Sequence, residues 1–121
     1  MSYTIDWTTI GYSTTEHIVG TYDGENVYKK IIVVPANNNT AISVSTGVNI
    51  KKLLGVSANM NVSSSTEDNW VGVFYGSATD FFRYFFRKYS SYTSHNLEIR
   101  VGSGNAGSNP NYIIEMTYTK N

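Results

Sequence analysis

Apolar and polar residues alternate along much of the chain with the two-residue period of a β-strand. The alternation is clearest over 97–101 and 112–119, where every second side chain is apolar, as in strands with one buried face. The same pattern over 41–45 and 53–60 predicts two more half-buried strands, and it places Leu54 on the apolar side of the second. Strands of this kind build sheets in which one face packs and the other meets water.

Two β-rich runs near the start of the chain predict a hairpin. Residues 16–22 and 27–34 flank a turn at 23–26, whose glycine can adopt the positive φ of a tight reversal. The two strands are expected to pack Tyr22 against Tyr28 across the pair. This hairpin is therefore interpreted as architecture rather than as a binding site.

The middle of the chain is rich in aromatic residues. Residues 70–75 are apolar on both sides, which predicts one strand with both faces covered, and the polar, serine-rich stretch 61–69 before them is predicted to be a loop. The spacing of 81–88, FFRYFFRK, fits a helix or a strand, and its aromatic content favours a strand. A loop rich in Gly, Ser and Asn is predicted over 102–109.

Length and composition agree with these strands. The 121 residues suffice for one hydrophobic core and one domain, 1–121. Seven or eight short strands separated by turns predict an all-β fold, an antiparallel β-sandwich with a jelly-roll-like or barrel-like closure as the alternative. Ser, Thr and Asn are abundant and Tyr occurs ten times, a composition that disfavours helices.

The charge balance argues against several classes of partner. Nine basic and nine acidic side chains cancel, whereas nucleic-acid binding depends on a surplus of Lys and Arg. No apolar run reaches the length of a membrane span, so we predict no membrane insertion. Cysteine is absent, which removes disulfides and zinc-thiolate sites.

Several short motifs lie near the two ends of the chain. They are Asp6-Trp7, Tyr12-Ser13-Thr14, Val19-Gly20-Thr21-Tyr22-Asp23-Gly24, Val27-Tyr28-Lys29-Lys30 and Tyr118-Thr119-Lys120. Together they resemble a module found at the ends of bacteriophage tail-fibre and baseplate proteins, whose pattern runs roughly YST, two or three residues, VVGTW, DGKPLYRK. The chain departs from this pattern with Tyr22 in place of Trp and with Glu25-Asn26 in place of Lys-Pro.

The resemblance implies a function. Modules of this family form β-rich tips of viral fibres, often as trimers, and serve in attachment to the host surface. It therefore implies a virion protein of the tail fibre or baseplate tip, synthesised in the bacterial cytoplasm. Residues 61–110 match no motif of the family, and this variable part is where we expect the ligand to bind.

Aromatic and polar residues suited to carbohydrate recognition lie within 68–92. Flat rings can stack on the apolar side of a sugar ring while directional polar groups bond its hydroxyls. The candidates are Trp70, Tyr75, Tyr89 and Tyr92 for stacking, and Asp68, Asn69, Arg83 and Arg87 for hydrogen bonds. Each aromatic residue has core packing as its alternative role. The partner expected on this interpretation is a bacterial surface glycan.

The two arginines of this set have two other possible roles. Arg83 and Arg87 could pair with Glu98 or Glu115 across the sheet. They could equally bind the phosphates of a teichoic-acid-like polymer, because the guanidinium fork suits that geometry. Both alternatives stay open at this point.

Catalytic chemistry has little support in the sequence. Two histidines and no cysteine provide no transition-metal site, and no serine lies in a nucleophile elbow. A glycosidase would need two carboxylates across a cleft, which Asp80, Glu98 and Glu115 could supply, but carboxylates on the strands of a small domain are mostly solvated surface. We predict a non-enzymatic protein without metal or cofactor.

Residues 31–34, IIVV, are apolar on both faces of their strand and need a cover on the second face. Either another subunit of a homo-oligomer or the N-terminal segment with Ile5, Trp7 and Ile10 could provide it. The sequence thus predicts a glycan-binding attachment module. The alternatives are a structural module that caps or trimerises a fibre, and a glycan depolymerase.

Overall fold

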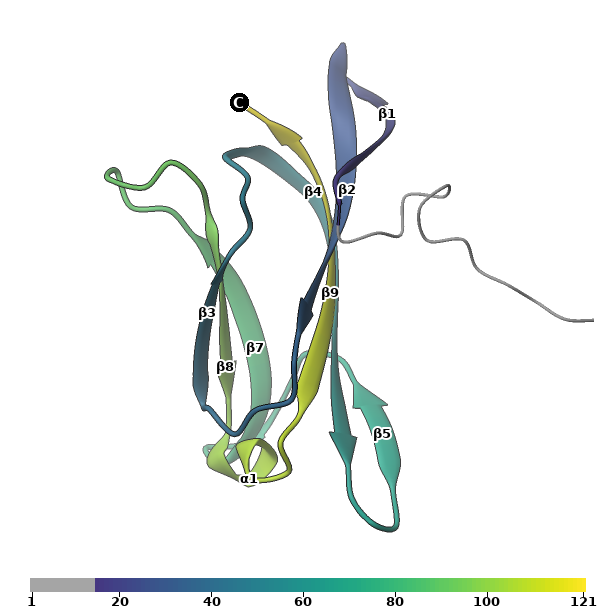
Figure 1. Ribbon diagram of the computed structural model, residues 1–121, viewed down its shortest axis with the longest axis vertical. Coiled ribbons are helices and arrows are strands. Elements are labelled where there is room, and N and C mark those ends of the chain that lie inside the picture. The colour runs from purple at the N-terminus through teal and green to yellow at the C-terminus, as the bar shows by residue number, and fades with distance from the viewer. Residues whose placement is uncertain (1–14) are drawn as a thin grey trace, which may run out of the picture.

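Two antiparallel sheets face each other across a shared core (Figure 1). The computed structural model describes residues 15–121, and this part of the chain contains nine strands and one short helix. The elements are β1 (His17–Tyr22), β2 (Glu25–Val34), β3 (Ala41–Ser45), β4 (Ile50–Ser63), β5 (Asp68–Val71), β6 (Phe74–Ser77), β7 (Asp80–Arg87), β8 (Asn96–Val101), α1 (Ser103–Ala106) and β9 (Asn111–Lys120). The predicted all-β sandwich is confirmed.

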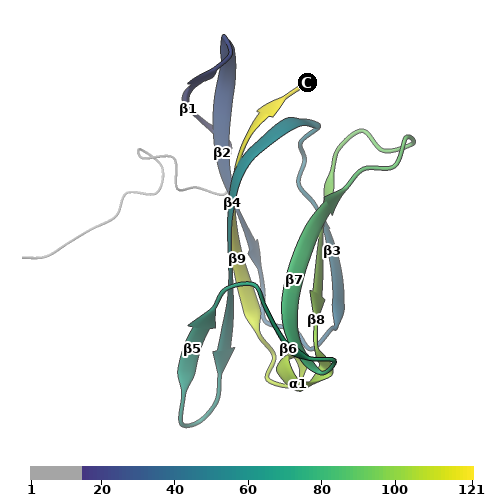
Figure 2. The ribbon, with the colours of Figure 1, turned by 180° about the vertical axis from the view of Figure 1, so that it is seen from behind.

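The strand orders show how distant segments meet. Sheet A has the order β1-β2-β9-β4-β5, and sheet B has the order β3-β8-β7-β6. Figure 2 shows the same two layers from behind, with β7 of sheet B in front of β3 and β8. The stretch 81–88 is therefore a strand, β7, at the centre of sheet B rather than a helix.

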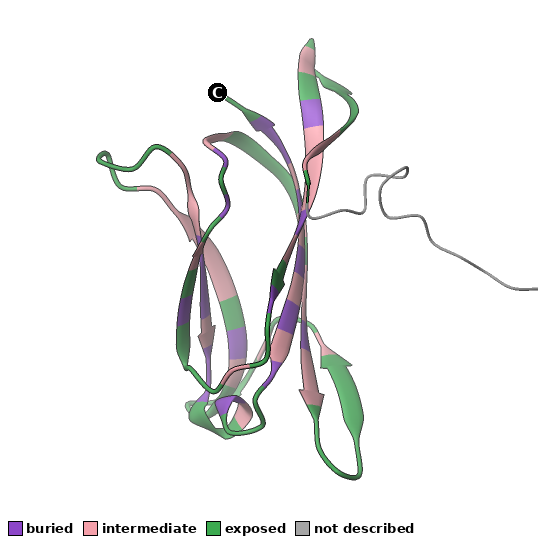
Figure 3. Ribbon diagram, in the orientation of Figure 1, coloured by how far each residue is buried: buried purple, intermediate pink, exposed green. Residues whose placement is uncertain are grey.

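Strand β9 supplies the middle of the core. Tyr112, Ile114, Met116 and Tyr118 alternate along it and are fully buried, as their period predicts. β9 pairs with β2 on one side and with β4 on the other, so its inward row lies centrally over sheet B. The buried and exposed bands of Figure 3 follow this alternation along both sheets.

The β1–β2 hairpin turns within two residues. Asp23 and Gly24 have φ of 53° and 75°, the left-handed pair that a primed two-residue turn requires. The predicted packing of Tyr22 on Tyr28 is wrong, because this register places Tyr22 opposite Glu25. Tyr28 stacks instead on Tyr118, with ring centroids 5.9 Å apart.

The connection from β3 to β4 crosses from sheet B to sheet A and is fixed to His95. The backbone N–H and the hydroxyl of Thr46 both donate to the His95 carbonyl, at 2.9 and 2.7 Å. The His95 N–H donates to the Val48 carbonyl at 2.8 Å, and the Ile50 N–H donates to His95 Nδ1 at 3.1 Å. These bonds hold the start of β8 against both sheets.

The single strand predicted over 70–75 is wrong. The chain leaves sheet A after β5, passes Gly72 and Val73, and joins sheet B as β6. Its faces are not covered either, since Trp70, Val73 and Tyr75 are 52%, 53% and 76% exposed. The apolar run therefore comprises two short edge strands of different sheets.

Three smaller differences from the sequence predictions have local causes. The polar stretch 61–69 is mostly strand, because β4 continues to Ser63 and pairs there with β5. Leu54 is exposed, because a bulge between Leu53 and Gly55 shifts the register of β4 against β9. The loop 102–109 contains the short helix α1.

No helix of the described residues is long and apolar enough to cross a bilayer.

Glu16 ties the start of the described chain to its last strand. The Tyr118 hydroxyl donates to Glu16 Oε2 at 2.6 Å, and Lys120 Nζ donates to Glu16 Oε1 at 2.5 Å. Burial, the largest single effect, raises the pKa of Glu16, but the hydrogen bonds from Lys120 and Tyr118 and the charges of Lys120 and Lys30 together bring this pKa below its ordinary 4.5. Glu16 is therefore held ionised.

Tyr118→Phe removes a hydrogen bond to a charged group, and we expect it to lower the free energy of unfolding by about 1.5 kcal/mol. Tyr112→Phe is the matched control, because the buried Tyr112 hydroxyl has no hydrogen-bond partner among the described residues. We expect this control to be neutral or stabilising. Urea denaturation of both variants measures the difference, and equal losses would show that the Glu16 bond contributes nothing.

Acidification should weaken the fold partly through Glu16. Because the folded-state pKa lies below 4.5, the unfolded chain takes up the proton first as pH falls. The stability contributed by Glu16 is thus complete above about pH 5.5 and is lost as pH falls through the folded-state pKa. We expect Glu16→Gln to lose less stability than the wild type on acidification in denaturation series. Parallel pH profiles would contradict this assignment.

Candidate binding surface

The residues predicted to bind a ligand fall into two groups on different sheets. Asp68, Asn69 and Trp70 lie on β5 at the edge of sheet A. The others belong to sheet B and the loop that follows β7: Tyr75, Arg83, Arg87, Tyr89 and Tyr92. The structure therefore does not bring all the predicted residues into one site.

The group on β5 is largely bonded to its neighbours. Asp68 Oδ1 accepts from Asn61 Nδ2 at 2.6 Å, and Asn69 Nδ2 donates to Glu67 Oε2 at 3.0 Å. Trp70 lies opposite Asn61 and is half exposed. This edge thus offers one ring and few free polar groups.

The group on sheet B belongs to a surface that its core residues orient. Phe82, Tyr84 and Phe86 of β7 pack against or lie within the core. Because alternate residues of a strand point to opposite faces, Arg83 and Arg87 point away from sheet A. The inward aromatic row thereby determines which side chains reach solvent.

We call the outward side chains of β7 and β8 at this place the arginine face. It consists of Arg83, Phe85, Arg87, Glu98 and Arg100, and it holds all three arginines of the chain. Tyr75 lies apart from Arg87, since its partner Phe81 is six residues earlier in β7. That separation corresponds to roughly 20 Å along a strand.

Glu98 is the centre of the arginine face. It is 7% exposed although it lies on an outer face. Its carboxylate oxygens lie 4.0 Å from Arg87 Nη1 and 3.6 Å from Arg100 Nη1. Both guanidinium groups also lie over the Phe85 ring, 4.9 Å and 5.4 Å from its centroid. The two arginines therefore cover the carboxylate and the ring together.

A chain of contacts leads from this face into the loop between β7 and β8. Arg87 Nη1 donates to the Tyr89 hydroxyl at 2.9 Å, and its guanidinium lies 5.4 Å from the Tyr89 ring centroid. Tyr89 in turn meets Tyr92 edge to face, with centroids 5.1 Å apart. Three of the predicted residues are thus joined in one contact network.

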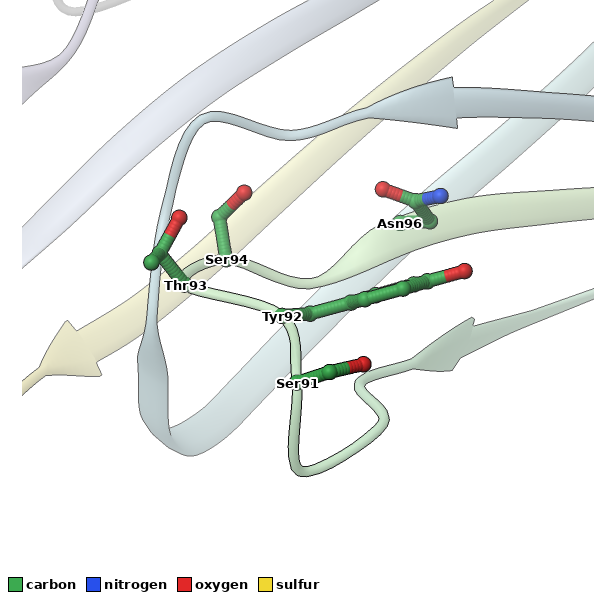
Figure 4. Close-up of a pocket in the computed structure, with 5 residues that line it drawn as sticks. All are labelled: Ser91, Tyr92, Thr93, Ser94 and Asn96. Atoms are coloured by element: carbon green, nitrogen blue, oxygen red, sulfur yellow. The ribbon is translucent and has the colours of Figure 1, made fainter.

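An open hollow of about 320 Å³ lies beside these tyrosines, lined by Ser91, Tyr92, Thr93, Ser94 and Asn96 (Figure 4). Hydroxyl groups of the loop and the Asn96 amide at the start of β8 line the hollow together with the Tyr92 ring. Asn96 pairs with Arg87 in the sheet, so the hollow adjoins the arginine face. One ring among several short polar groups suits a polar, ring-shaped ligand.

Some residues of this surface were not predicted. Phe85, Arg100 and Asn96 join it through strand pairing, and the alternation over 97–101 already placed Glu98 and Arg100 on the polar side of their strand. The signal that could have found them is the pairing of β7 with β8, which was not predicted. Two successive strands joined by a loop suggest a hairpin, and that hairpin would have placed these residues side by side. Nothing in the sequence except its composition indicated that the hydroxyl groups of residues 91–94 line a hollow.

The three carboxylates considered for glycoside hydrolysis do not form a pair. Asp80 accepts from Asn105, Glu115 pairs with Lys29 on sheet A, and Glu98 lies between arginines on sheet B. Among the described residues no group of three or more His, Cys, Asp or Glu side chains is placed to hold a metal ion. No catalytic role is assigned to them.

Glu98→Gln should destabilise the fold, because it leaves arginines close together without their shared counter-charge. We expect the free energy of unfolding to fall by roughly 1–3 kcal/mol. Glu67→Gln, in the exposed loop before β5, is the charge-matched control and should change it by less than about 0.5 kcal/mol. Chemical denaturation checks both values; a harmless Glu98→Gln would mean that the carboxylate does not hold the arginines.

Comparison with other proteins adds no relative. No protein-family model, curated protein or solved structure matches the chain. The resemblance to tail-fibre modules therefore stays a prediction, and some of its motifs, with the possible cover by Ile5, Trp7 and Ile10, lie outside the described residues. The arginine face and the adjoining hollow are thus the features of the described chain that bear on its function.

Proposed function

We propose that this chain is a non-enzymatic module that binds a saccharide on the bacterial surface. The observation that carries the proposal is the continuous contact network from Arg87 through Tyr89 to Tyr92 and the hollow beside it. It combines rings, hydroxyls and guanidinium groups on one side of the molecule. These are the groups that stack on a sugar ring and bond its hydroxyls.

The exposure of the rings supports recognition over packing. Tyr89 is 51% exposed and Tyr92 is 38% exposed, whereas Tyr112 and Tyr118 are fully buried. Core packing therefore does not account for the two loop tyrosines. Each contacts the other, which holds their rings in place without covering them.

The resemblance to tail-fibre tips supports the biological setting of the proposal. On that basis the module belongs to a virion, is carried at a fibre or baseplate tip, and works as a trimer that attaches the particle to its host. Several weak sites on one particle gain avidity of roughly 10² to 10⁴ over one site. One shallow site per chain is therefore sufficient for attachment.

A second candidate function is a structural module that caps or trimerises a fibre. Val33 is 52% exposed and lies opposite Ile113 on the outer face of sheet A, where an apolar pair favours contact with another subunit. This role needs no ligand. It is compatible with the first, because the two surfaces belong to different sheets.

A glycan array with three variants tests the proposal. We expect Tyr92→Ala to weaken binding by roughly 0.5–1.5 kcal/mol through the lost ring contact. Trp70→Ala should leave binding unchanged, since β5 lies on the other sheet. Tyr22→Ala, which removes a comparably exposed tyrosine from the hairpin of sheet A, is the matched control.

Other results of this array would lead to other conclusions. Binding that survives Tyr92→Ala but not Trp70→Ala would move the site to β5. Absence of binding to every glycan, with a trimer in mass photometry, would favour the structural module. Shortening of a bound polymer would overturn the non-enzymatic assignment.

A further inference from the structure

We infer that the ligand of the arginine face is an anionic saccharide, whose phosphate or carboxylate group is held between Arg83 and Arg100. This inference rests on the proposed function and names the chemical class of its ligand.

Arg83 and Arg100 lie directly opposite each other on neighbouring strands. Side chains in such a pair have Cβ atoms about 4.5–5.5 Å apart, and like charges there destabilise a sheet. The chain has only three arginines, yet two of them form this pair at the centre of sheet B. A bound anion between them would turn the repulsion into attraction.

The contacts of the three arginines differ. Arg87 and Arg100 each lie near Glu98 and over the Phe85 ring. Arg83 is exposed, and its side chain makes no hydrogen bond, ion pair or ring contact with another residue of the described chain. Its guanidinium group can therefore bind a ligand without breaking a side-chain contact within residues 15–121.

The arginine face carries a local positive charge although the chain is neutral. Three arginines stand against one carboxylate, Glu98, which leaves a net charge of 3 − 1 = +2 on this face. The formal net charge of the whole chain is zero. The rest of the chain therefore carries a net charge of 0 − 2 = −2, and an anionic ligand is attracted to this side of sheet B.

The guanidinium group decides which anions fit. Its planar fork forms paired hydrogen bonds with phosphate or carboxylate groups. Two forks that start from directly opposite positions can converge on one such group. Tyr89 and Tyr92 lie next to Arg87, which is four residues after Arg83 in β7, or roughly 13 Å along the strand. An oligosaccharide of several units that carries the anionic group can therefore span the arginine pair and the hollow.

A nucleic acid is a weaker match for the same surface. Strand-borne aromatic platforms bind single strands by leaving ring faces free for bases. Here two guanidinium groups lie over the Phe85 ring, and Tyr89 and Tyr92 lie in the loop after β7 rather than along the strand. No row of open ring faces therefore runs along β7.

The test compares polymers that differ in charge. Biolayer interferometry would use a phosphorylated mannan, polygalacturonate, neutral dextran and a single-stranded oligonucleotide as separate probes. We expect one or both of the anionic polysaccharides to bind at least about tenfold more tightly than dextran. This affinity should fall as NaCl rises from about 0.05 to 0.5 M, because salt screens exposed charges. The anionic polysaccharide that binds more tightly shows whether the arginine pair prefers a phosphate or a carboxylate group.

Arg83→Gln is the decisive variant, because it removes the charge without breaking a described contact. We expect about tenfold weaker binding of the anionic probe, with a thermal midpoint at or above that of the wild type, since the repulsion with Arg100 is relieved. Lys51→Gln removes one positive charge at the start of β4 in sheet A, together with the exposed ion pair of Lys51 with Glu25, and is the control for loss of one charge elsewhere. It should leave binding unchanged.

The remaining outcomes separate this inference from the proposed function. Equal binding of neutral and anionic glycans, still weakened by Tyr92→Ala, would overturn the anionic ligand and keep the saccharide site. Unchanged binding by Arg83→Gln would overturn the role of Arg83. Tighter binding of the oligonucleotide, or binding of no glycan on this probe set and on the array, would overturn both proposals.

Discussion

The core between the two sheets requires a row of large side chains from β7, and this requirement orients the arginine face. Phe82 is fully buried and Phe86 packs against both parts of the core. Because a strand sends alternate residues to opposite faces, Arg83 and Arg87 have to point outward. The register of β7 with β8 then brings Arg100 opposite Arg83.

The arginine face keeps its charges close together at some cost to the sheet. Glu98 partly neutralises Arg87 and Arg100, and the Phe85 ring gives both guanidinium groups a second favourable contact. Neither compensation reaches Arg83. An arginine whose side chain has no partner among the described residues, although it lies on a central strand, is more readily explained by a bound ligand.

Local signals predicted most of the fold and only part of the site. The alternation of β9 identified its buried row, and Gly24 identified the hairpin turn, because both depend on neighbouring residues. Periodicity could not predict that the stretch 70–75 breaks at Gly72. The apolar residues before Gly72 belong to sheet A and those after it belong to sheet B, and the pattern does not distinguish the two sheets. Arg100 was missed because its place beside Arg83 depends on strand pairing across 17 positions.

The attachment of His95 to the β3–β4 connection has a consequence for affinity. Four hydrogen bonds fix the C-terminal end of the loop that carries Tyr89 and Tyr92, and the Arg87 to Tyr89 bond restrains its beginning. Because this loop is already restrained at both ends, it loses little conformational entropy when a ligand binds to it. Such preorganisation lets a small, shallow contact area retain useful binding strength.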